Sequence, residues 1–386
     1  MLRKKTLAVA ACFAALSLAS FAAPAPVIVI SKSDTIALAL APFGGADGPA
    51  VAKVVQNDLA LSGFFSLTDA GKAGMTVSGA ASGASLQGKV VNRSGSNVLL
   101  RSYEGGTREK AHAFANDIIE TLTDKKGMAG SKIAFVSTRS GRKEIYTADY
   151  DGSNLRQWTR DGTISVAPAL SPDGRHLAYT SYRSGYADIW SIDFASGVLQ
   201  RIVKYPGTNS GAAFSPDGSE IACTMSRDGN PELYIVNASG GGARRLTHTP
   251  GVESSPSWSP DGQELVYSSD DTGSPQLFRI MAGGGGARRI PTGHTYCTKP
   301  SWSPDGRKIA FNIREGGSFQ VAVLDLASNA VRVVSGGGEA RDPVWGPDSR
   351  HLLFTRGEDL ILLDVQTSRT INLLSSLGIS EPTWTR

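Results

Sequence analysis

Cysteine is scarce in this sequence. The 386-residue chain contains three cysteines, Cys12, Cys223 and Cys297. A chain of this length does not need disulfide bonds to stabilise its core, and these positions have no spacing typical of a metal site. The histidines are also spread out rather than grouped as metal ligands: His112, His176, His248, His294 and His351. We therefore expect no disulfide framework, no metal ion and no other cofactor.

A strong excess of charge is also missing. The formal net charge is +4, and three of the positive charges are Arg3, Lys4 and Lys5 at the extreme N-terminus. The rest of the chain is therefore close to neutral. A near-neutral protein has no overall field that attracts nucleic acid or anionic lipid, so we expect neither as a partner.

The first 22 residues have the pattern of a secretory signal peptide. The positive segment 3–5 precedes a short apolar run at 6–18, and Ser20 and Ala22 are small residues before Ala23. The alternative is a membrane anchor, but a spanning helix needs about 20 apolar residues. The residue directly after the expected cleavage point is not a cysteine, and this does not favour a lipid anchor. We expect an exported protein that is not inserted in a membrane.

A repeat of about 44 residues dominates the C-terminal two thirds of the chain. Its most visible part is the sequence Ser-Pro-Asp-Gly, with a degenerate last copy, at 171–174, 215–218, 259–262, 303–306 and 346–349. Proline presets the first turn residue, aspartate can bond the backbone, and glycine adopts positive φ. The motif therefore predicts a tight hairpin turn.

The segments around each turn read as short strands. The second strand of each repeat has one apolar residue at a fixed position, which is aromatic in every repeat but one. We call these residues the aromatic column: Phe135, Tyr179, Cys223, Tyr267, Phe311 and Phe354. A third strand follows, and glycine turns then lead to a fourth, such as 243–246. Four short strands per repeat are typical of a β-propeller blade. The position of Cys223 in this column predicts a buried hydrophobic residue, whereas Cys297 is expected in an interblade loop where it is accessible.

The C-terminal segment is expected to close the propeller. Residues 381–386 resemble the first strands at 256–259 and 300–303, and the first blade, which begins near Lys132, has no first strand of its own. Pairing of the two chain regions would complete six blades and protect the sheet edges.

The region before the repeat predicts a small α/β domain. We expect strands at 36–40, 75–80, 86–91 and 97–103, and helices at 48–62 and 107–123. Asp47 is expected to cap the first helix with its side chain. The predicted fold class is an all-β six-bladed propeller preceded by a small α/β domain. The predicted boundaries are 1–22 for the signal peptide, 23–129 for the α/β domain and 130–386 for the propeller.

This order of parts resembles the TolB family. Specific similarities are the sequences at 39–43, 149–154 and 211–218. The resemblance implies a non-enzymatic periplasmic protein of the Tol-Pal system that supports outer-membrane integrity and constriction during cell division. It implies binding of a Pal-like outer-membrane lipoprotein on one propeller face. It also implies contact with a TolA-like inner-membrane protein through the N-terminal segment.

The loops after the second strands suggest a docking face. Arg139, Arg183 and Arg227 recur with a spacing of 44, and Asp271 and Glu315 take the same place in the next two blades. One half of the rim would then be basic and the other acidic, which would orient a partner. The alternative is that these are ordinary solvated turn residues.

The interblade loops reach the same face and are expected to expose further candidates: Tyr205, His248, His294, Tyr296 and Arg341. Aromatic and arginine side chains are typical interface anchors. By resemblance, the regions around His248 and His294 lie where the family contacts Pal. Ordinary loop packing is the alternative for each residue.

No catalytic residues are predicted. The sequence has no Gly-x-Ser-x-Gly motif, and the run Gly283–Gly286 is expected in a hairpin rather than in a phosphate-binding loop. Two alternatives to an adaptor stay open: a propeller lyase or hydrolase with its site in the central channel, and an exported propeller that binds a sugar or peptide.

Overall fold

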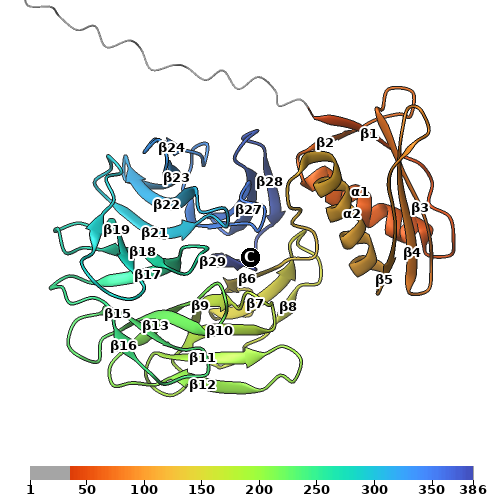
Figure 1. Ribbon diagram of the computed structural model, residues 1–386. Coiled ribbons are helices and arrows are strands. Elements are labelled where there is room, and N and C mark those ends of the chain that lie inside the picture. Colours follow the sequence, from red (N-terminus) through yellow and green to blue (C-terminus); the bar gives the residue numbers. More distant parts are fainter. Residues whose placement is uncertain (1–34, 386) are drawn as a thin grey trace, which may run out of the picture. The chain divides into compact units, whose positions relative to one another are not determined.

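The computed structural model describes residues 35–385 of the chain. The predicted signal peptide lies outside these residues. The described part contains one five-stranded sheet with two helices, followed by six four-stranded sheets arranged around a channel (Figure 1). This confirms the predicted fold class. No helix in this part is both long and apolar enough to cross a membrane.

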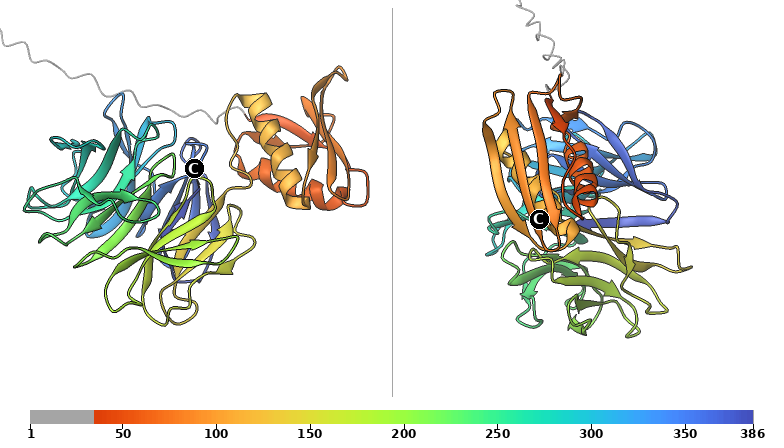
Figure 2. Two further views of the ribbon diagram at one scale, coloured as in Figure 1. Left: turned by 60° about the horizontal axis from the view of Figure 1, so that its bottom comes forward. Right: turned by 90° about the vertical axis from the view of Figure 1, so that its right-hand side faces the viewer.

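The α/β part is built on a mixed sheet with the strand order β2-β1-β3-β4-β5. Its elements are β1 (Ile36–Leu40), α1 (Gly48–Leu61), β2 (Phe65–Leu67), β3 (Met75–Ser82), β4 (Ser85–Asn92), β5 (Asn97–Glu104) and α2 (Thr107–Thr123). Strand β1 is parallel to β2 and β3, and β3 to β5 form an antiparallel meander. Figure 2 shows both helices on the same face of the sheet.

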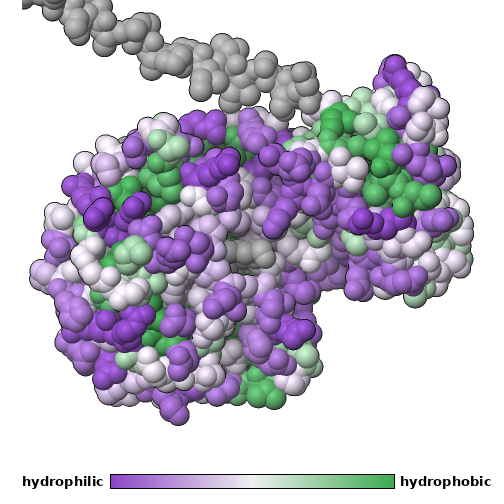
Figure 3. All heavy atoms as spheres, viewed as in Figure 1, coloured by the Kyte–Doolittle hydropathy of each residue, from purple (hydrophilic) through white to green (hydrophobic). Residues whose placement is uncertain are grey.

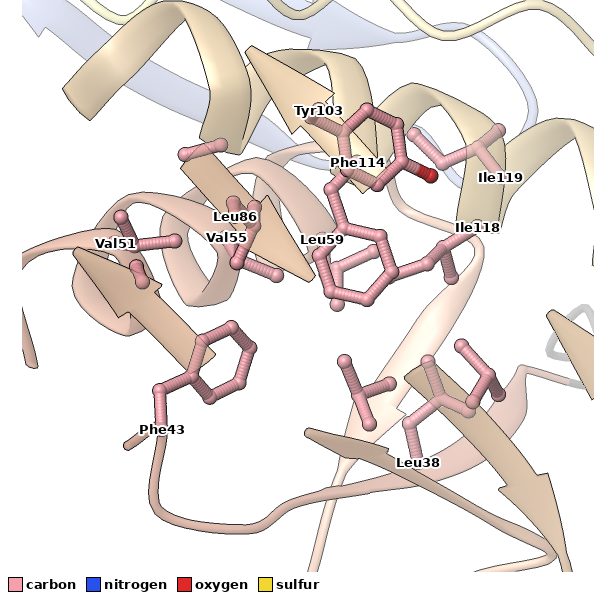
Figure 4. Close-up of a cluster of buried hydrophobic side chains, with 14 of the residues drawn as sticks. Leu38, Phe43, Val51, Val55, Leu59, Leu86, Tyr103, Phe114, Ile118 and Ile119 are labelled. Carbon is pink, nitrogen blue, oxygen red and sulfur yellow. The ribbon is translucent and has the colours of Figure 1, made fainter. Parts of the chain in front are cut away.

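The core of the α/β part lies between the helices and the sheet. The labelled side chains in Figure 4 come from both layers and point toward one another. Gly88 on β4 is needed here because a Cβ at this position would lie 2.6 Å from the ring of Phe114 on α2. The predicted helices and four strands are confirmed to within a few residues, but the short strand β2 was not predicted.

The predicted role of Asp47 is wrong in one respect. Asp47 is the N-cap residue of α1, but its side chain makes no capping hydrogen bond. Its carboxylate instead lies 3.9 Å from the ammonium of Lys110, whose side chain is fully buried. An ion pair with a buried lysine replaces the capping bond.

Each blade is a four-stranded antiparallel sheet, and in blades 2–6 the strands follow the order of the chain from the channel outward. Blade 1 contains β29 (Ile379–Trp384), β6 (Lys132–Ser137), β7 (Glu144–Asp149) and β8 (Arg156–Gln157). Blade 2 contains β9 (Ser165–Leu170), β10 (His176–Ser181), β11 (Asp188–Asp193) and β12 (Leu199–Val203). Blade 3 contains β13 (Asn209–Phe214), β14 (Glu220–Met225), β15 (Glu232–Asn237) and β16 (Arg244–Arg245).

The second half of the propeller repeats this plan. Blade 4 contains β17 (Glu253–Trp258), β18 (Glu264–Ser269), β19 (Gln276–Met281) and β20 (Arg288–Arg289). Blade 5 contains β21 (Cys297–Trp302), β22 (Lys308–Glu315), β23 (Ser318–Asp325) and β24 (Val331–Val333). Blade 6 contains β25 (Arg341–Trp345), β26 (His351–Arg356), β27 (Asp359–Asp364) and β28 (Thr370–Leu374).

The C-terminal strand closes the ring as predicted. Strand β29 pairs with β6 in antiparallel register, with Ile379 opposite Ser137 and Trp384 opposite Ile133. Trp384 is 3% exposed, and its indole N–H donates a hydrogen bond of 2.8 Å to Ser131 Oγ. The first blade therefore combines the first strands of the propeller with the last strand of the described chain.

The Ser-Pro-Asp-Gly segments form the predicted turns. In the first copy Ser171 Oγ donates to Asp173 Oδ1 at 2.5 Å, and the backbone N–H of His176 donates to Ser171 Oγ at 2.9 Å. Gly174 has a φ of 67°, and in the degenerate copy Ser349 takes the equivalent conformation with a φ of 56°. The side-chain bonds explain why the serine and aspartate recur with the glycine.

The two cysteines that follow the predicted signal peptide, Cys223 and Cys297, are both buried. Cys223 is 0% exposed, as its place in the aromatic column predicted. The expectation for Cys297 was wrong, because it is the first residue of β21 and is also 0% exposed. Its sulfur lies 3.1 Å from Thr292 Oγ1 in the preceding loop. Strand β21 begins at Cys297, so the thiol lies inside the sheet rather than in the loop.

A bulge in the first strand of every blade lines the central channel. Each pairing between first and second strands has a register shift at this point. The bulge residues have positive φ and border a cavity of about 510 Å³: Ala167, Gly211, Ser255, Lys299, Asp342 and Glu381. We call this set the bulge ring.

Hydrogen bonds link the bulge ring to neighbouring blades. The N–H of Gly211 donates to Thr180 Oγ1 of blade 2 at 3.2 Å, and the N–H of Lys299 donates to Ser268 Oγ of blade 4 at 3.1 Å. The N–H of Ala167 donates to Glu381 at 2.6 Å. A side chain of the preceding blade thus satisfies a backbone group that the bulge removes from the sheet.

A buried polar cluster links helix α1 to the first blade. Asp58 of α1 has a fully buried side chain and accepts a hydrogen bond from the hydroxyl of Tyr150, which follows β7. His112 Nδ1 of α2 lies 2.7 Å from the other carboxylate oxygen of Asp58. Both parts belong to the same compact unit, so the predicted boundary after residue 129 stays a prediction.

Candidate protein-binding face

Two sets of loops form one face of the propeller, which we call the loop face. One set joins second to third strands within a blade, and the other joins successive blades. Hydrogen bonds connect the sets, such as those from Tyr182 N to Ile164 O at 3.2 Å and from Ser226 N to Thr208 O at 3.0 Å. The predicted site residues all lie in these loops or at the strand ends beside them.

The three arginines with the spacing of 44 are exposed, and each lies over an aromatic ring. The guanidinium carbon of Arg183 is 4.8 Å from the ring centre of Trp190, and that of Arg227 is 4.8 Å from the ring centre of Tyr205. Arg139 is more distant, at 5.9 Å from the Tyr146 ring. Stacking of this kind holds a guanidinium in place while its edge stays in water.

Nearby carboxylates reduce the expected basic character of this half of the rim. Arg183 lies 3.2 Å from Asp161, and Arg227 lies 3.6 Å from Asp228. Asp271 is exposed in blade 4, in the half of the rim that was expected to be acidic. The contrast in charge between the two halves is therefore smaller than the five residues alone indicate.

A second group of predicted residues meets around Phe319 of β23. The ring of Tyr296 packs edge-on against Phe319 with 5.7 Å between ring centres, and the guanidinium of Arg341 lies 3.8 Å above the same ring. His294 Nδ1 lies 3.3 Å from Glu315 at the end of β22. The structure thus brings His294, Tyr296 and Arg341 to one region of blades 5 and 6.

His248 is an exposed residue of the loop between blades 3 and 4. Tyr205 belongs to a different junction, between blades 2 and 3, where it is half-buried under Arg227. The predicted residues therefore form a broad surface across several blades rather than one pocket. A surface of this kind suits a protein partner better than a small substrate.

Exposed apolar side chains on the loop face were missed by the sequence reasoning. Tyr186 is 75% exposed, and Ile164, Tyr182 and Val252 are between 43% and 49% exposed. They lie outside the repeat pattern, so only the structure reveals their exposure. In the view of Figure 3 the propeller surface is mostly hydrophilic, with hydrophobic residues in separate patches. Exposed tyrosines surrounded by polar residues are typical of protein interfaces.

A row of buried polar residues supports the loop face from below. It lies at the start of the third strand in five successive blades, at the first residue of the strand in blades 1–4 and at the third in blade 5: Glu144, Asp188, Glu232, Gln276 and Gln320. Arg245 donates to Glu232 at 2.7 Å, and Arg289 donates to Gln276 at 2.9 Å. The regular spacing of 44 was the signal in the sequence that would have identified this row.

The central channel contains charged groups of both signs. Burial disfavours the charged form of Lys299, but the nearby Glu381 and Asp342 raise its pKa above the ordinary value for lysine. The cavity wall is otherwise rich in proline and aromatic residues. Within residues 35–385, no three histidine, cysteine or acidic side chains are grouped so that they would hold a metal ion.

Comparison with known proteins places these features in context. Residues 119–386 match the family model described as "TolB beta propeller domain". The chain is 36% identical over 168 residues to the Tol-Pal system protein TolB of Geobacter metallireducens. This alignment covers 34% of this chain and 39% of that protein. It is 42% identical over 105 residues to the protein TolB homolog of Chlorobium chlorochromatii, covering 26% and 24%. The alignments thus span less than half of the length of these curated relatives.

The fold is also similar to that in the crystal structure of TolB from Acinetobacter baumannii. The TM-score is 0.82, and the match covers 92% of this chain and 97% of that chain at 24% identity. At this level of identity the comparison shows a shared fold, and the coverage includes most of the α/β part as well as the propeller.

Proposed function

The chain belongs to the TolB beta propeller family, and on that basis we propose that it is a non-enzymatic adaptor of a Tol-Pal system in the periplasm. In this role the loop face binds a Pal-like outer-membrane lipoprotein. The protein thereby supports outer-membrane integrity and constriction during cell division. We also propose that residues 23–129 and 130–386 act as separate domains.

The observation that carries the proposal is the character of the loop face. It combines ring-stacked arginines such as Arg183 and Arg227 with exposed tyrosines such as Tyr186. Arginine and tyrosine dominate the binding energy of many protein interfaces because they bury a large area and still form hydrogen bonds. The relatives named as Tol-Pal system proteins support the choice of partner.

Contact with a TolA-like inner-membrane protein is proposed for the N-terminal segment. We take residues 23–34, which follow the predicted signal peptide and lie outside the described part of the chain, as this segment. Deletion of this segment should abolish co-purification with the TolA-like protein while leaving binding of the lipoprotein intact.

The main test is affinity capture from a cell-envelope extract of the host. We expect the tagged, folded protein to recover a lipoprotein with a peptidoglycan-binding domain. Recovery of no such lipoprotein by the folded protein would overturn the proposal. It would favour the alternative of an exported propeller that binds a sugar or peptide, or of a propeller lyase or hydrolase.

A sharper test replaces two predicted contact residues together. His248→Ala with Tyr296→Ala should weaken the affinity for the purified lipoprotein at least about tenfold, which corresponds to about 1.4 kcal/mol. The control is His176→Ala, because His176 begins β10 at the opposite end of its blade and pairs with Asp193 at 3.3 Å. Titration calorimetry of the three proteins measures the effect, and equal affinities would place the interface elsewhere.

A further inference from the structure

Two buried carboxyl groups meet at the junction of blades 3 and 4, just below the loop face. Glu232 is the first residue of β15, Glu253 is the first residue of β17, and both are 0% exposed. The equivalents of Glu253 at the start of the first strands of blades 2, 3 and 5 are Ser165, Asn209 and Cys297. Among these junctions, a carboxyl group of a first strand meets one of a third strand only here.

Each of the two groups has one oxygen with partners in the surrounding loop. Oε1 of Glu232 accepts hydrogen bonds from Arg245 at 2.7 Å and from the backbone N–H of Thr249 at 2.8 Å. Oε1 of Glu253 accepts hydrogen bonds from the hydroxyls of Thr249 and Ser269, both at 2.7 Å. Thr249 therefore connects the loop between the blades to both carboxyl groups.

The second oxygens have no such donor. Oε2 of Glu232 and Oε2 of Glu253 are buried and have no hydrogen-bond donor among residues 35–385. The two carboxyl groups are held beside each other by Thr249, whose backbone N–H donates to Glu232 at 2.8 Å and whose hydroxyl donates to Glu253 at 2.7 Å. Two buried acceptors in contact are costly unless a proton lies between them. A proton shared by the two carboxyl groups would supply the donor that the surrounding residues do not give to these oxygens.

The charges around the pair agree with one shared proton. Arg245 from β16 is the cation in contact with the pair, so one of the two negative charges is balanced and the other is not. Tyr267 from β18 also faces the pair, and its hydroxyl is neutral because burial and the two glutamates raise its pKa. Asp228 and Asp271 lie further out and add negative potential.

The surroundings shift the pKa values of the two glutamates in opposite directions. Burial and the hydrogen bond with Glu232 raise the pKa of Glu253 to about 7. Burial also disfavours the ionised form of Glu232, but hydrogen bonds from its neighbours keep its pKa below the ordinary value. Arg245 lies 2.7 Å from Glu232, which favours the ionised form of that group, so the proton is assigned to Glu253 and Glu232 is the acceptor.

We propose that Glu253 donates a shared proton to Glu232 and that release of this proton loosens the loop at residues 247–252 of the loop face. On release the proton passes to solvent, and the charge of the pair changes from −1 to −2 beside a single arginine. Repulsion between the carboxylates then acts on Thr249, the residue that both groups hold. The loop includes His248, so a part of the loop face becomes sensitive to pH near neutrality.

Other contacts of the loop do not involve the pair. Asn230 donates to Thr249 O at 2.7 Å, and the N–H of Val252 donates to Asp270 at 2.7 Å. These bonds keep the loop attached when the proton leaves, so we expect local opening rather than unfolding of the blade. The inference concerns the chain alone and does not depend on the identity of a partner.

The test compares the full-length protein with Glu253→Gln. A glutamine amide donates to Glu232 as the protonated acid does, and it does so at every pH. Infrared difference spectra at pH 6 should show a carboxylic-acid band in the wild-type protein that disappears at pH 8.5 and is absent from the variant. Hydrogen exchange of a peptide covering residues 247–252 should lose about tenfold in protection between pH 6 and pH 8, beyond the intrinsic change, only in the wild-type protein.

Two further samples make the outcome decisive. Glu144→Gln changes the blade 1 equivalent of Glu232, which faces Thr159 rather than a second acid, and should leave both signals unchanged. A chelator-treated wild-type sample distinguishes a bound cation from a proton. The proposal is overturned if Glu253→Gln retains the acid band, if both proteins show the same exchange profile, or if the chelator alone opens the loop.

Discussion

Replacement of Trp384 by alanine tests how much the closing strand contributes to stability. Trp384 lies at the end of β29, is 3% exposed and packs in the cluster that includes Ile133 and Tyr150. A Cβ added to Gly346 of blade 6 would lie 2.9 Å from the ring of Trp384. The aromatic side chain therefore fills the space between blade 1 and blade 6.

The expected loss follows from these contacts. Truncation of a buried tryptophan to alanine costs about 3–5 kcal/mol through lost burial and the cavity that remains. Loss of the indole hydrogen bond to Ser131 adds about 1 kcal/mol. The total is of the same order as the whole stability of many domains, so the variant should be close to unfolding at room temperature.

The matched control is Trp258→Ala, which removes the same side chain from the same position of blade 4. Trp258 is 2% exposed, and its indole N–H donates to Ala213 O at 2.9 Å. Both variants should lose a similar free energy of unfolding in urea. Only Trp384→Ala should expose the edge of β6, so it should also form dimers or aggregates that size-exclusion chromatography detects.

Two results would refute this reasoning. A loss below about 1 kcal/mol for Trp384→Ala would mean that the ring does not depend on its closing strand. Equal association of both variants would mean that the unpaired edge of β6 has no special role. Circular dichroism and tryptophan fluorescence should be followed together, because separate transitions would show that the α/β part and the propeller unfold independently.

Three further predictions concern buried polar groups. Asp58→Ala leaves the Tyr150 hydroxyl and His112 without their buried acceptor, so it should lower the free energy of unfolding in urea by about 3–5 kcal/mol. Tyr150→Phe removes one of these two bonds and should lower it by about 1–2 kcal/mol. Equal losses for the two variants would contradict the geometry in which Asp58 serves both partners. Burial raises the pKa of Cys223 to about 12 and also raises that of Cys297, so a thiol reagent at pH 8 should label neither until denaturant is added. Between the ordinary glutamate pKa of 4.5 and about 7, the folded protein holds the proton of Glu253 that the unfolded chain has lost. The free energy of unfolding should therefore fall by about 3 kcal/mol as the pH rises from 5 to 8, and calorimetric melting of Glu253→Gln should show no such fall.

The repeat made most of the propeller predictable. A Ser-Pro-Asp-Gly turn marks where one strand ends and the next begins. The similarity of residues 381–386 to the strand at 256–259 identified the strand that pairs with the one beginning at Lys132. Errors arose at single residues where local preference and tertiary contact disagree. Asp47 has the residue type of a side-chain cap, but the buried Lys110 attracts its carboxylate.

The candidate site was less predictable because its properties depend on pairing. Spacing located Arg183 and Arg227 in equivalent loops, but it contained no information on the carboxylates of Asp161 and Asp228 that neutralise them. The contact of Tyr296 and Arg341 through Phe319 joins three loops or strands that are apart in the sequence. Such contacts follow from the positions of neighbouring blades, which periodicity within one repeat does not describe.

The bulge ring has a consequence for assembly of so regular a chain. Blades with similar sequences risk pairing with the wrong neighbour, a common failure of repeat proteins. Five of the six bulge N–H groups donate to side chains of three kinds: the hydroxyls of Thr180 and Ser268, the amide of Asn312 and the carboxylates of Asp342 and Glu381. Because hydroxyl, amide and carboxylate acceptors differ in length and charge, we expect a blade beside a neighbour of another kind to leave its bulge N–H without a well-placed acceptor. The ring thus marks the order of the blades as well as lining their common centre.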